Sequence, residues 1–360
     1  MKFQLSIKTQ KAISYQVITG KNNFRNLRNL IDTKLNPDKS IIITDKNVYA
    51  LYKDKINSEL IMSSNNFEVI VIPAGEKSKS QKTRDELENR IIDLTPSRNT
   101  LIVAIGGGVV GDISGFLAST ILRGIRYVQV PTTIIAQMDS SIGGKTGINT
   151  KHSKNLIGTF HQPSFVLVDF DFIKTLPDEE YFNGLAEILK SLLIGSSSDF
   201  EFLERYSDLV LNREESVINK LIEKAIKIKI NVVSKDPDEK NLRKILNFGH
   251  TIGHAIESLS SYKIKHGFAV AEGMIVESYL SFLKNGLSEV DLFRIQYIVD
   301  KLKLDKHFRR KLDFNKVYEK MTYDKKRIND QITFSLLRKI GKCDYNKIVS
   351  RENVELAYNH

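Results

Sequence analysis

The chain has 360 residues, of which 41% are hydrophobic and 27% charged, an ordinary composition for a folded protein with room for two domains. The formal net charge of +11 fits nucleic acid or anionic small molecules, but the lysines are scattered and form no long basic run, which argues against a nucleic-acid-binding protein. No apolar run approaches the ~18 residues of a membrane span. The single cysteine, Cys343, excludes an internal disulfide framework and fits a reducing compartment. We expect a cytoplasmic protein with small-molecule partners.

The first half of the chain alternates between strand and helix patterns. Phe3, Leu5 and Ile7 alternate with polar neighbours, which favours a strand over a targeting peptide. Buried-strand runs follow at residues 41–44, 67–72 and 100–105, with helical patterns after the first run and at residues 82–92. This alternation predicts a mostly parallel sheet with helices on its faces. The clusters around Asp45, Glu76 and Gly108 each follow a strand, so they should meet at the edge where such sheets bind ligands.

From residue 179 onward the periodicity is helical, at residues 185–193, 218–233, 247–259 and 268–283. We therefore predict an N-terminal, Rossmann-like, mostly parallel α/β domain over residues 1–177 and a C-terminal helical metal-binding domain over residues 178–360. The basic tail from Asp324 carries no clear period, and we expect it to be irregular.

A glycine-rich turn follows the third strand run. Gly106, Gly108 and Gly111 match the spacing of a dinucleotide-binding loop, and they lie between a strand and a helical pattern. The acidic residue expected ~20 positions later for the ribose is missing, although Asp45 could take that role. The alternative is a helix packed closely on its sheet without a ligand.

Residues 130–149 are dense in small residues and hydroxyls, with one carboxylate, Asp139, and one lysine, Lys145. This composition suits an anion site built from backbone amides and Lys145, although a plain loop would have a similar composition. Lys154 and Asn155 add a further cation and an amide a few residues later.

Three of the seven histidines lie between residues 247 and 270. His250 and His254 are four residues apart, so a helix would place them on one face, where they could bind a divalent metal with a carboxylate from elsewhere. The alternative is a pair of partly exposed histidines with no ligand. Gly249 and Gly253 beside them suggest that something approaches the backbone closely.

Taken together, the motifs resemble those of the 3-dehydroquinate synthase family. In family order they are Thr-Asp-Lys-Asn-Val at 44–48, Pro-Ala-Gly-Glu-Lys at 73–77, Gly-Gly-Gly-Val-Val-Gly-Asp at 106–112, Arg-Gly-Ile at 123–125, Pro-Thr-Thr at 131–133, Gly-Lys-Thr-Gly-Ile-Asn at 144–149, Lys-Asn at 154–155, Thr-Leu-Pro at 175–177, Gly-Leu-Ala-Glu-Ile-Leu-Lys at 184–190, Leu-Asn-Phe-Gly-His-Thr-Ile-Gly-His at 246–254 and His-Gly-x-Ala-Val at 266–270. A weaker match lies at Asp324, Lys325 and Lys326.

The resemblance implies specific site residues. The implied metal ligands, for Zn²⁺ or Co²⁺, are Glu187, His250 and His266, with His254 in the substrate site instead. The implied NAD contacts are Asp45, Asn47, Glu76, Lys79, Gly108, Val109, Val110, Gly111, Asp112, Thr132, Thr133, Lys145, Lys154 and Thr175. The implied substrate and catalytic residues are Asp139, Lys145, Asn155, Lys190, Lys229, Arg243, Asn247 and His254, with Arg123 reaching in from the partner subunit of a homodimer.

The resemblance also implies the reaction. The expected enzyme converts the anionic sugar phosphate 3-deoxy-D-arabino-heptulosonate 7-phosphate to 3-dehydroquinate and phosphate, by transient NAD-dependent oxidation, phosphate elimination, re-reduction and aldol closure. The alternatives are a cyclase for another phosphorylated sugar, an NAD- and metal-dependent polyol dehydrogenase, and a basic nucleic-acid-binding protein. Two positions depart from the family pattern: Phe268 stands where a Glu is usual, and Asn241 where a Gly is common. If the usual Glu orients His266, its loss would lower metal affinity.

Overall fold

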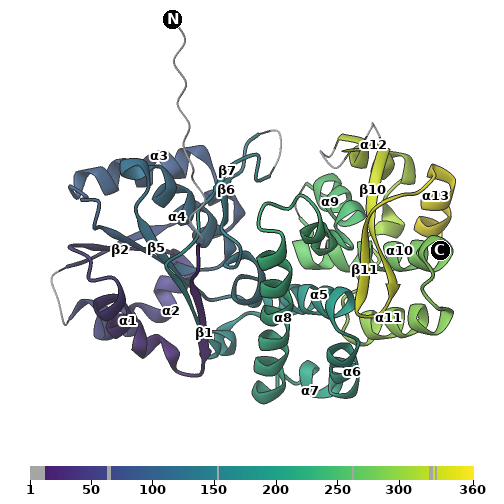
Figure 1. Ribbon diagram of the computed structural model, residues 1–360, viewed down its shortest axis with the longest axis horizontal. Helices are drawn as coiled ribbons and strands as arrows, with labels where there is room; N and C mark the ends of the chain where they lie inside the picture. The colour runs from purple at the N-terminus through teal and green to yellow at the C-terminus, as the bar shows by residue number, and fades with distance from the viewer. Residues whose placement is uncertain (1–12, 63–65, 152–153, 262, 324–326, 329–330) are drawn as a thin grey trace, which may run out of the picture.

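The computed structural model describes residues 13–62, 66–151, 154–261, 263–323, 327–328 and 331–360. The predicted strand at residues 3–7 and the Lys325 and Lys326 positions lie outside these residues. A sheet with flanking helices forms one half, and a mainly helical half follows it (Figure 1). No helix in the described part of the chain is long and apolar enough to cross a membrane.

The N-terminal half is built on one six-stranded parallel sheet, which confirms the predicted fold class. Its strands, in spatial order, are β1 (Gln16–Gly20), β8 (Phe165–Asp169), β5 (Arg126–Pro131), β4 (Leu101–Gly106), β2 (Ser40–Asp45) and β3 (Phe67–Ile72). The strand runs predicted at residues 41–44, 67–72 and 100–105 correspond to β2, β3 and β4.

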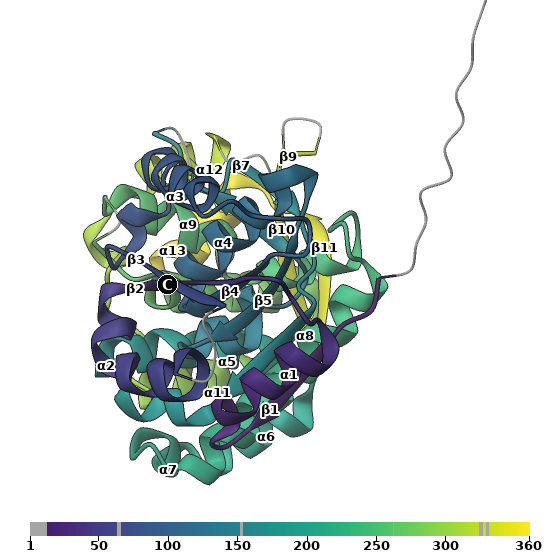
Figure 2. The same ribbon diagram turned by 90° about the vertical axis from the view of Figure 1, so that its left-hand side faces the viewer.

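Helices bury both faces of the sheet (Figure 2). On one face, α1 (Leu27–Lys34) and α2 (Lys46–Ile56) pack on a core that includes Ile42, Val103 and Val128. On the other face, α3 (Gln81–Asp93) and α4 (Gly108–Thr120) pack against residues of opposite parity, among them Ile43 and Ile102. Both faces of these strands are therefore apolar, as expected for a parallel sheet covered by helices.

Shorter elements connect the strands. They are η1 (Asn23–Asn26), η2 (Asn57–Ile61), η3 (Glu76–Ser78), η4 (Ile121–Arg123), η5 (Ala136–Ser140), η6 (Phe170–Thr175) and a hairpin of β6 (Lys145–Ile148) with β7 (Ile157–Phe160).

The second half contains the predicted helices. Three of them extend beyond the predicted range at both ends, whereas the pattern at residues 247–259 corresponds to a helix that begins only at His250. They are α5 (Asp178–Gly195), α6 (Ser197–Arg205), α7 (Ser207–Leu211), α8 (Glu215–Lys235), η7 (Leu242–Asn247), α9 (His250–Leu259), α10 (His266–Asn285), α11 (Glu289–Lys301), η8 (Arg309–Lys311) and α12 (Phe314–Tyr323). One core joins the halves, because Ile134 and Met138 from the sheet half pack in the same cluster as apolar residues of α5, α8 and α10.

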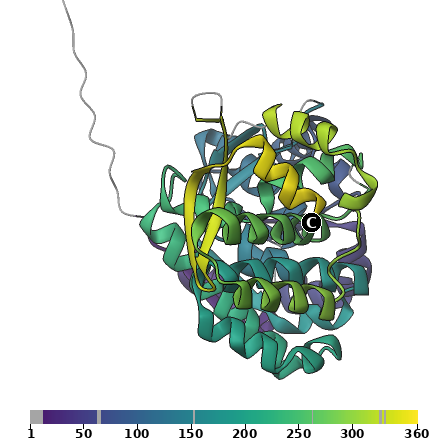
Figure 3. The same ribbon diagram turned by 90° about the vertical axis from the view of Figure 1, so that its right-hand side faces the viewer.

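The expectation of an irregular tail was wrong. The tail forms β9 (Arg327–Ile328), β10 (Gln331–Lys339), β11 (Lys342–Ile348) and α13 (Arg351–Asn359), and the β10–β11 hairpin lies along one side of the helices in Figure 3. Phe334 and Leu336 of this hairpin are buried against α9 and α10 residues such as Ile252 and Val276. Tertiary packing therefore decides the conformation of this segment.

Candidate metal centre and active site

The predicted polar clusters do meet at one edge of the sheet. Asp45, Glu76 and the Gly108 turn follow the carboxyl ends of β2, β3 and β4, which pair in parallel register. The Asp45 carboxylate caps α2, because its Oδ1 accepts hydrogen bonds from the amides of Asn47 (2.9 Å) and Val48 (3.1 Å). Thr132 joins this edge after β5, where its amide donates to the Gly106 carbonyl at 3.0 Å.

Both interpretations of the glycine turn apply, at different residues. A side chain on Gly111 would place its Cβ 2.5 Å from Oε1 of Gln129, so this glycine lets α4 pack closely on β5. Gly107 and Gly108, by contrast, stand at the beginning of α4, beside Thr133 and Ser140. Helix amides at this position favour a phosphate group.

Three helices contribute the predicted metal ligands. Glu187 comes from α5, His250 is the first residue of α9, and His266 is the first residue of α10. The carboxylate of Glu277 on α10 fixes the start of α9, because it accepts hydrogen bonds from the amides of Gly249 (2.7 Å) and Thr251 (3.1 Å).

The glycines beside the histidines are explained by helix packing. A Cβ on Gly249 would lie 2.8 Å from the Val270 carbonyl oxygen, and one on Gly253 would lie 2.9 Å from that of Ala269. The group that approaches the α9 backbone is therefore the backbone of α10. This close contact brings His266 into reach of His250, with ring centroids 5.2 Å apart.

The geometry around Glu187 suits a divalent cation. Nε2 of His250 lies 3.6 Å from Oε1 of Glu187, and Nε2 of His266 lies 3.3 Å from the same oxygen. Nδ1 of His250 faces the Phe248 carbonyl oxygen at 3.0 Å, which leaves Nε2 directed at Glu187. Within the described residues, neither oxygen of this buried carboxylate makes a hydrogen bond of good geometry, although Nζ of Lys190 lies 2.6 Å from Oε2 as an ion pair. One carboxylate and two imidazoles form a usual ligand set for Zn²⁺ or Co²⁺, so the residues present fit such an ion.

The charge states agree with this fit. Burial alone would raise the pKa of Glu187, but Lys190 and the two histidines hold it well below its ordinary value. Burial lowers the pKa of His250 well below 6.5, which keeps the imidazole in the neutral form that binds metals. Burial opposes protonation of His266, yet Glu187 and Glu257 outweigh it and raise its pKa to about 10. In the absence of an ion, a protonated ring thus supplies positive charge between two carboxylates, and an arriving cation would displace that proton.

His254 offers an alternative third ligand. One ring nitrogen from each of His250, His254 and His266 can be chosen so that all three lie within 4.8 Å of one another. Oε1 of Glu187 lies within 3.6 Å of Nε2 of both shared histidines, and Glu187 is deeply buried, at 1% exposure. Both sets share His250 and His266, so only the third ligand differs.

Lysines surround this centre, each beside a carboxylate, and all of them except Lys145 are buried. The pairs are Lys190 with Glu187 at 2.6 Å, Lys229 with Asp139, Lys145 with Glu239, and Lys79 with Asp112. Burial lowers the pKa of Lys229 although Asp139 opposes the shift. These pairs bring together lysines and carboxylates from both halves of the chain.

Two further predicted residues complete the pocket. Arg243 is 1% exposed, and its guanidinium donates to the carbonyl oxygens of Gly143 (3.3 Å) and Pro237 (2.5 Å). Nδ2 of Asn247 donates to Oε1 of Glu239 at 3.1 Å. Asn155, which the family resemblance assigns to the substrate site, contacts Lys79 instead.

Sequence reasoning missed two carboxylates of this region, Glu239 and Glu257. Glu257 lies seven residues after His250 and therefore on the same face of α9, a spacing that could have revealed it. Its Oε2 lies 3.3 Å from Nδ1 of His266. Phe268, in place of the family's usual Glu, points elsewhere: it lines a pocket of about 310 Å³ with the Lys306 ammonium 5.3 Å from its ring centroid. The partner of His266 in this chain is therefore Glu257.

Arg123 does not belong to this edge of the sheet. It lies three residues before Arg126, the first residue of β5, which pairs with Leu101 at the start of β4. Arg123 therefore lies at the amino ends of the strands. Thr175 lies at the carboxyl edge, after β8, where its hydroxyl contacts that of Tyr52 on α2.

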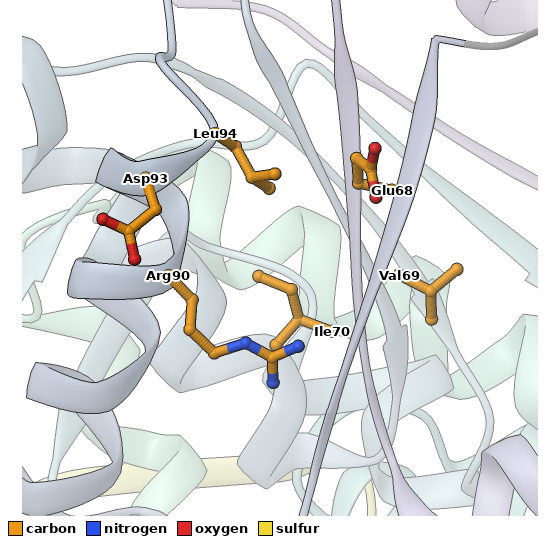
Figure 4. A pocket seen from close by; sticks show the side chains of 6 residues that line it. All are labelled: Glu68, Val69, Ile70, Arg90, Asp93 and Leu94. Carbon is orange, nitrogen blue, oxygen red and sulfur yellow. The ribbon is translucent and has the colours of Figure 1, made fainter.

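A separate cavity of about 200 Å³ lies between β3 and the end of α3 (Figure 4). Its lining residues are Glu68, Val69, Ile70, Arg90, Asp93 and Leu94. It contains no histidine and is formed where α3 ends, whereas Glu76 follows the opposite end of β3. It is therefore not part of the centre described above.

Comparisons with known proteins agree with this geometry. The family description "3-dehydroquinate synthase N-terminal" matches residues 69–183, and "3-dehydroquinate synthase C-terminal" matches residues 184–327. A 3-dehydroquinate synthase of Thermoanaerobacter pseudethanolicus is 40% identical over 343 residues, covering 95% of this chain and 96% of the relative.

Two solved structures are also similar. The structure of 2-epi-5-epi-valiolone synthase from Streptomyces hygroscopicus, with NAD⁺ and Zn²⁺ bound, superposes with a TM-score of 0.89 at 28% identity and covers 98% of each chain. That of 2-deoxy-scyllo-inosose synthase, complexed with carbaglucose-6-phosphate, NAD⁺ and Co²⁺, superposes with a TM-score of 0.86 at 28% identity and covers 96% of each chain.

Proposed function

Because this chain belongs to the 3-dehydroquinate synthase family, we propose that it converts 3-deoxy-D-arabino-heptulosonate 7-phosphate to 3-dehydroquinate and phosphate. The observation that carries the proposal is the convergence of Glu187, His250 and His266 beside the buried cations Lys190, Lys229 and Arg243. A cation site next to several anion-binding side chains suits a substrate that carries both a carboxylate and a phosphate.

Glu187, His250 and His266 are the proposed ligands of the divalent ion. The proposed NAD site follows the carboxyl ends of the strands, where Asp45, the turn at residues 108–112 and Thr132 lie together. When bound, NAD would accept a hydride from the substrate and return it, while the ion would polarise the oxygen at the reacting carbon.

The chain's own side chains would bind and orient the substrate. Arg243 and Lys229 are assigned to the carboxylate, and Lys145 with Asn155 to the phosphate. Lys229 and Lys145 pair with Asp139 and Glu239 without substrate, so an anionic substrate would compete with these carboxylates for them. Asp139 and His254 lie beside the centre as the groups that could hold or pass a proton.

A cyclase that acts on a sugar phosphate without a carboxylate is the second candidate, because the similar structure of 2-deoxy-scyllo-inosose synthase holds carbaglucose-6-phosphate. The buried Arg243 and Lys229 favour the sugar acid. Without a substrate carboxylate, two buried cations of the pocket would have no group of the substrate to bind.

The assembly proposed is a homodimer in the cytoplasm. Arg123 supports the dimer, because it lies at the sheet edge opposite to the site of its own chain and is exposed. From there it would contribute to the site of a second copy, as the family resemblance implies.

The test is phosphate release by the purified protein supplied with NAD⁺ and Zn²⁺. We expect release from the heptulosonate phosphate and none from glucose 6-phosphate, with no net NADH. Lys229→Met should abolish release, whereas Lys227→Met, an exposed lysine of the same helix, should not alter it. Release from glucose 6-phosphate alone would support the second candidate. Net NADH without phosphate would indicate a dehydrogenase.

A further inference from the structure

Glu257 is shared between two partners from different parts of the fold. Its carboxylate is 4% exposed and lies on the α9 face that also carries His250 and His254. One oxygen, Oε2, lies 3.3 Å from Nδ1 of His266, and the other, Oε1, accepts a hydrogen bond from Nζ of Lys154 at 2.7 Å. A buried carboxylate is costly unless it is paired, so both contacts hold the Glu257 side chain in place.

Lys154 connects this carboxylate to the sheet half. It lies between β6 and β7, and its Nζ is also 3.8 Å from Oε1 of Glu76, which follows β3. The same Glu76 oxygen accepts a hydrogen bond from Nδ2 of Asn149 at 2.7 Å. A chain of polar contacts therefore runs from His266 through Glu257 and Lys154 to Glu76, at the sheet edge assigned to the dinucleotide.

We propose that Glu257 is the positioning residue of His266, and that the Glu257–Lys154 pair couples the metal site to the dinucleotide site so that each ligand tightens the binding of the other. This inference rests on the proposed function, which assigns the two ligands to these two ends.

The direction of the coupling follows from ordering. An ion on Nε2 of His266 would fix the ring, and the fixed Nδ1–H would donate to Glu257. A fixed Glu257 would then hold Lys154 in the position that faces Glu76, so less ordering of this lysine would remain for dinucleotide binding. Coupling between two ligands is reciprocal, so NAD⁺ should strengthen metal binding by the same factor.

The experiment measures two affinities of the full-length protein, each with and without the other ligand. The NAD⁺ dissociation constant is determined by calorimetry with and without Zn²⁺, and the Zn²⁺ affinity by chelator competition with and without NAD⁺. We expect about tenfold coupling in the unaltered protein, within the common range for coupled sites. Lys154→Met should reduce this factor to near one, whereas Lys151→Met, an exposed lysine of the same segment, should preserve it.

The Glu257 variants separate positioning from coupling. Glu257→Ala should weaken Zn²⁺ binding about 10- to 100-fold, as loss of a ligand's hydrogen-bond partner does. Glu257→Gln keeps an acceptor for His266 but loses the charge, so it should bind Zn²⁺ better than Glu257→Ala while losing the coupling. Thermal unfolding of the metal-free variants verifies that they are folded.

A coupling factor near one in the unaltered protein, or full coupling in Lys154→Met, would overturn the inference. Unchanged Zn²⁺ affinity in Glu257→Ala would overturn the positioning role. Phosphate release by the unaltered protein is measured in parallel. If it persists while the coupling is absent, the inference fails and the proposed function stands.

Discussion

The main-chain oxygen of Asn183 occupies the space that a side chain on Gly267 would need, because a Cβ there would lie only 2.0 Å from it. Oδ1 of the same asparagine accepts a hydrogen bond from the Gly267 amide at 2.7 Å. Asn183 lies one helical turn before Glu187, and Gly267 follows His266, so this contact sets the distance between two proposed metal ligands.

Gly267→Ala should therefore damage the metal site. The added methyl group would force α10 away from α5, and overpacking of this kind costs about 1–3 kcal/mol of unfolding free energy. Because His266 moves with α10, Zn²⁺ affinity measured by chelator competition should fall at least about tenfold, as when ligand geometry is disturbed.

The matched control is Gly20→Ala. A Cβ at Gly20, the last residue of β1, would be 3.6 Å from its nearest neighbour, an ordinary contact. Gly20→Ala should leave both stability and metal affinity nearly unchanged. Unaltered Zn²⁺ binding in Gly267→Ala would show that the Asn183 contact does not position His266.

Local periodicity predicted the elements whose burial pattern is regular. The helical pattern at residues 218–233 lies within α8, and the apolar runs at residues 41–44 and 67–72 correspond to β2 and β3. The β10–β11 hairpin was not predicted, since its pairing shifts register between Phe334 and Leu336 and again between Leu337 and Lys339. Such irregularities interrupt the alternation that identifies a strand from sequence.

The site was only partly predictable for a related reason. The His250 and His254 spacing is local and indicated a metal site directly. Glu239 and Glu257, by contrast, pair with lysines 94 and 103 residues away in sequence, and no local pattern records such a pairing. The metal carboxylate and the pocket cations were predicted only through the family resemblance, because an isolated helix carboxylate or lysine has no distinguishing pattern.

The third metal ligand can be identified by comparing Glu187→Gln with His254→Ala. If Glu187 binds the ion, Glu187→Gln should lose Zn²⁺ and phosphate release together, with an affinity loss exceeding the ~10- to 100-fold typical of an outer partner. His254→Ala should retain Zn²⁺. Metal content after dialysis is the measurement, and the opposite pattern would assign the site to the three imidazoles.

One complication of Glu187→Gln is that it removes the partner of Lys190, which is 1% exposed and 2.6 Å from the carboxylate. An unpaired buried ammonium can cost about 3–5 kcal/mol. The double variant Glu187→Gln with Lys190→Met removes this charge. It should recover stability in chemical denaturation but still fail to retain Zn²⁺.

Glu277 should be a determinant of stability rather than of chemistry. It is fully buried, and its carboxylate accepts hydrogen bonds from the Gly249, Thr251 and Ile252 amides at the start of α9. Glu277→Gln would place an amide donor against these N–H groups. We expect a loss of about 2–4 kcal/mol in unfolding free energy, since hydrogen bonds to charged groups contribute more than neutral ones.

The control for Glu277 is Glu355→Gln on the exposed face of α13, which should change stability by less than about 0.5 kcal/mol. Denaturant unfolding without metal measures both variants. Equal stabilities would show that other groups, and not this carboxylate, fix the start of α9.

Glu272 should make stability depend on pH. Its side chain is fully buried on α10, and its Oε1 accepts hydrogen bonds from the Lys306 (3.2 Å) and Phe308 (2.8 Å) amides. Burial, helped by the charge of Asp305, raises the pKa of Glu272 from 4.5 to about 7, against the opposing effects of Phe308 and Arg309. Between these two values the folded chain keeps a proton that the unfolded chain releases. Unfolding free energy should therefore fall as pH rises from about 4.5 to 7, by roughly 3 kcal/mol in total.

Glu272→Gln removes the group that titrates. The unfolding free energy of this variant minus that of the unaltered protein should therefore grow with pH across that window and become constant above it. Urea denaturation at several pH values between about 4.5 and 8 measures this difference. Asp305→Asn should lower the pKa of Glu272 and narrow the window from its upper end, because it removes the neighbouring charge. A difference independent of pH would mean that Glu272 is already ionised in the folded chain, with Arg309, whose Nε lies 3.5 Å away, as its counter-ion.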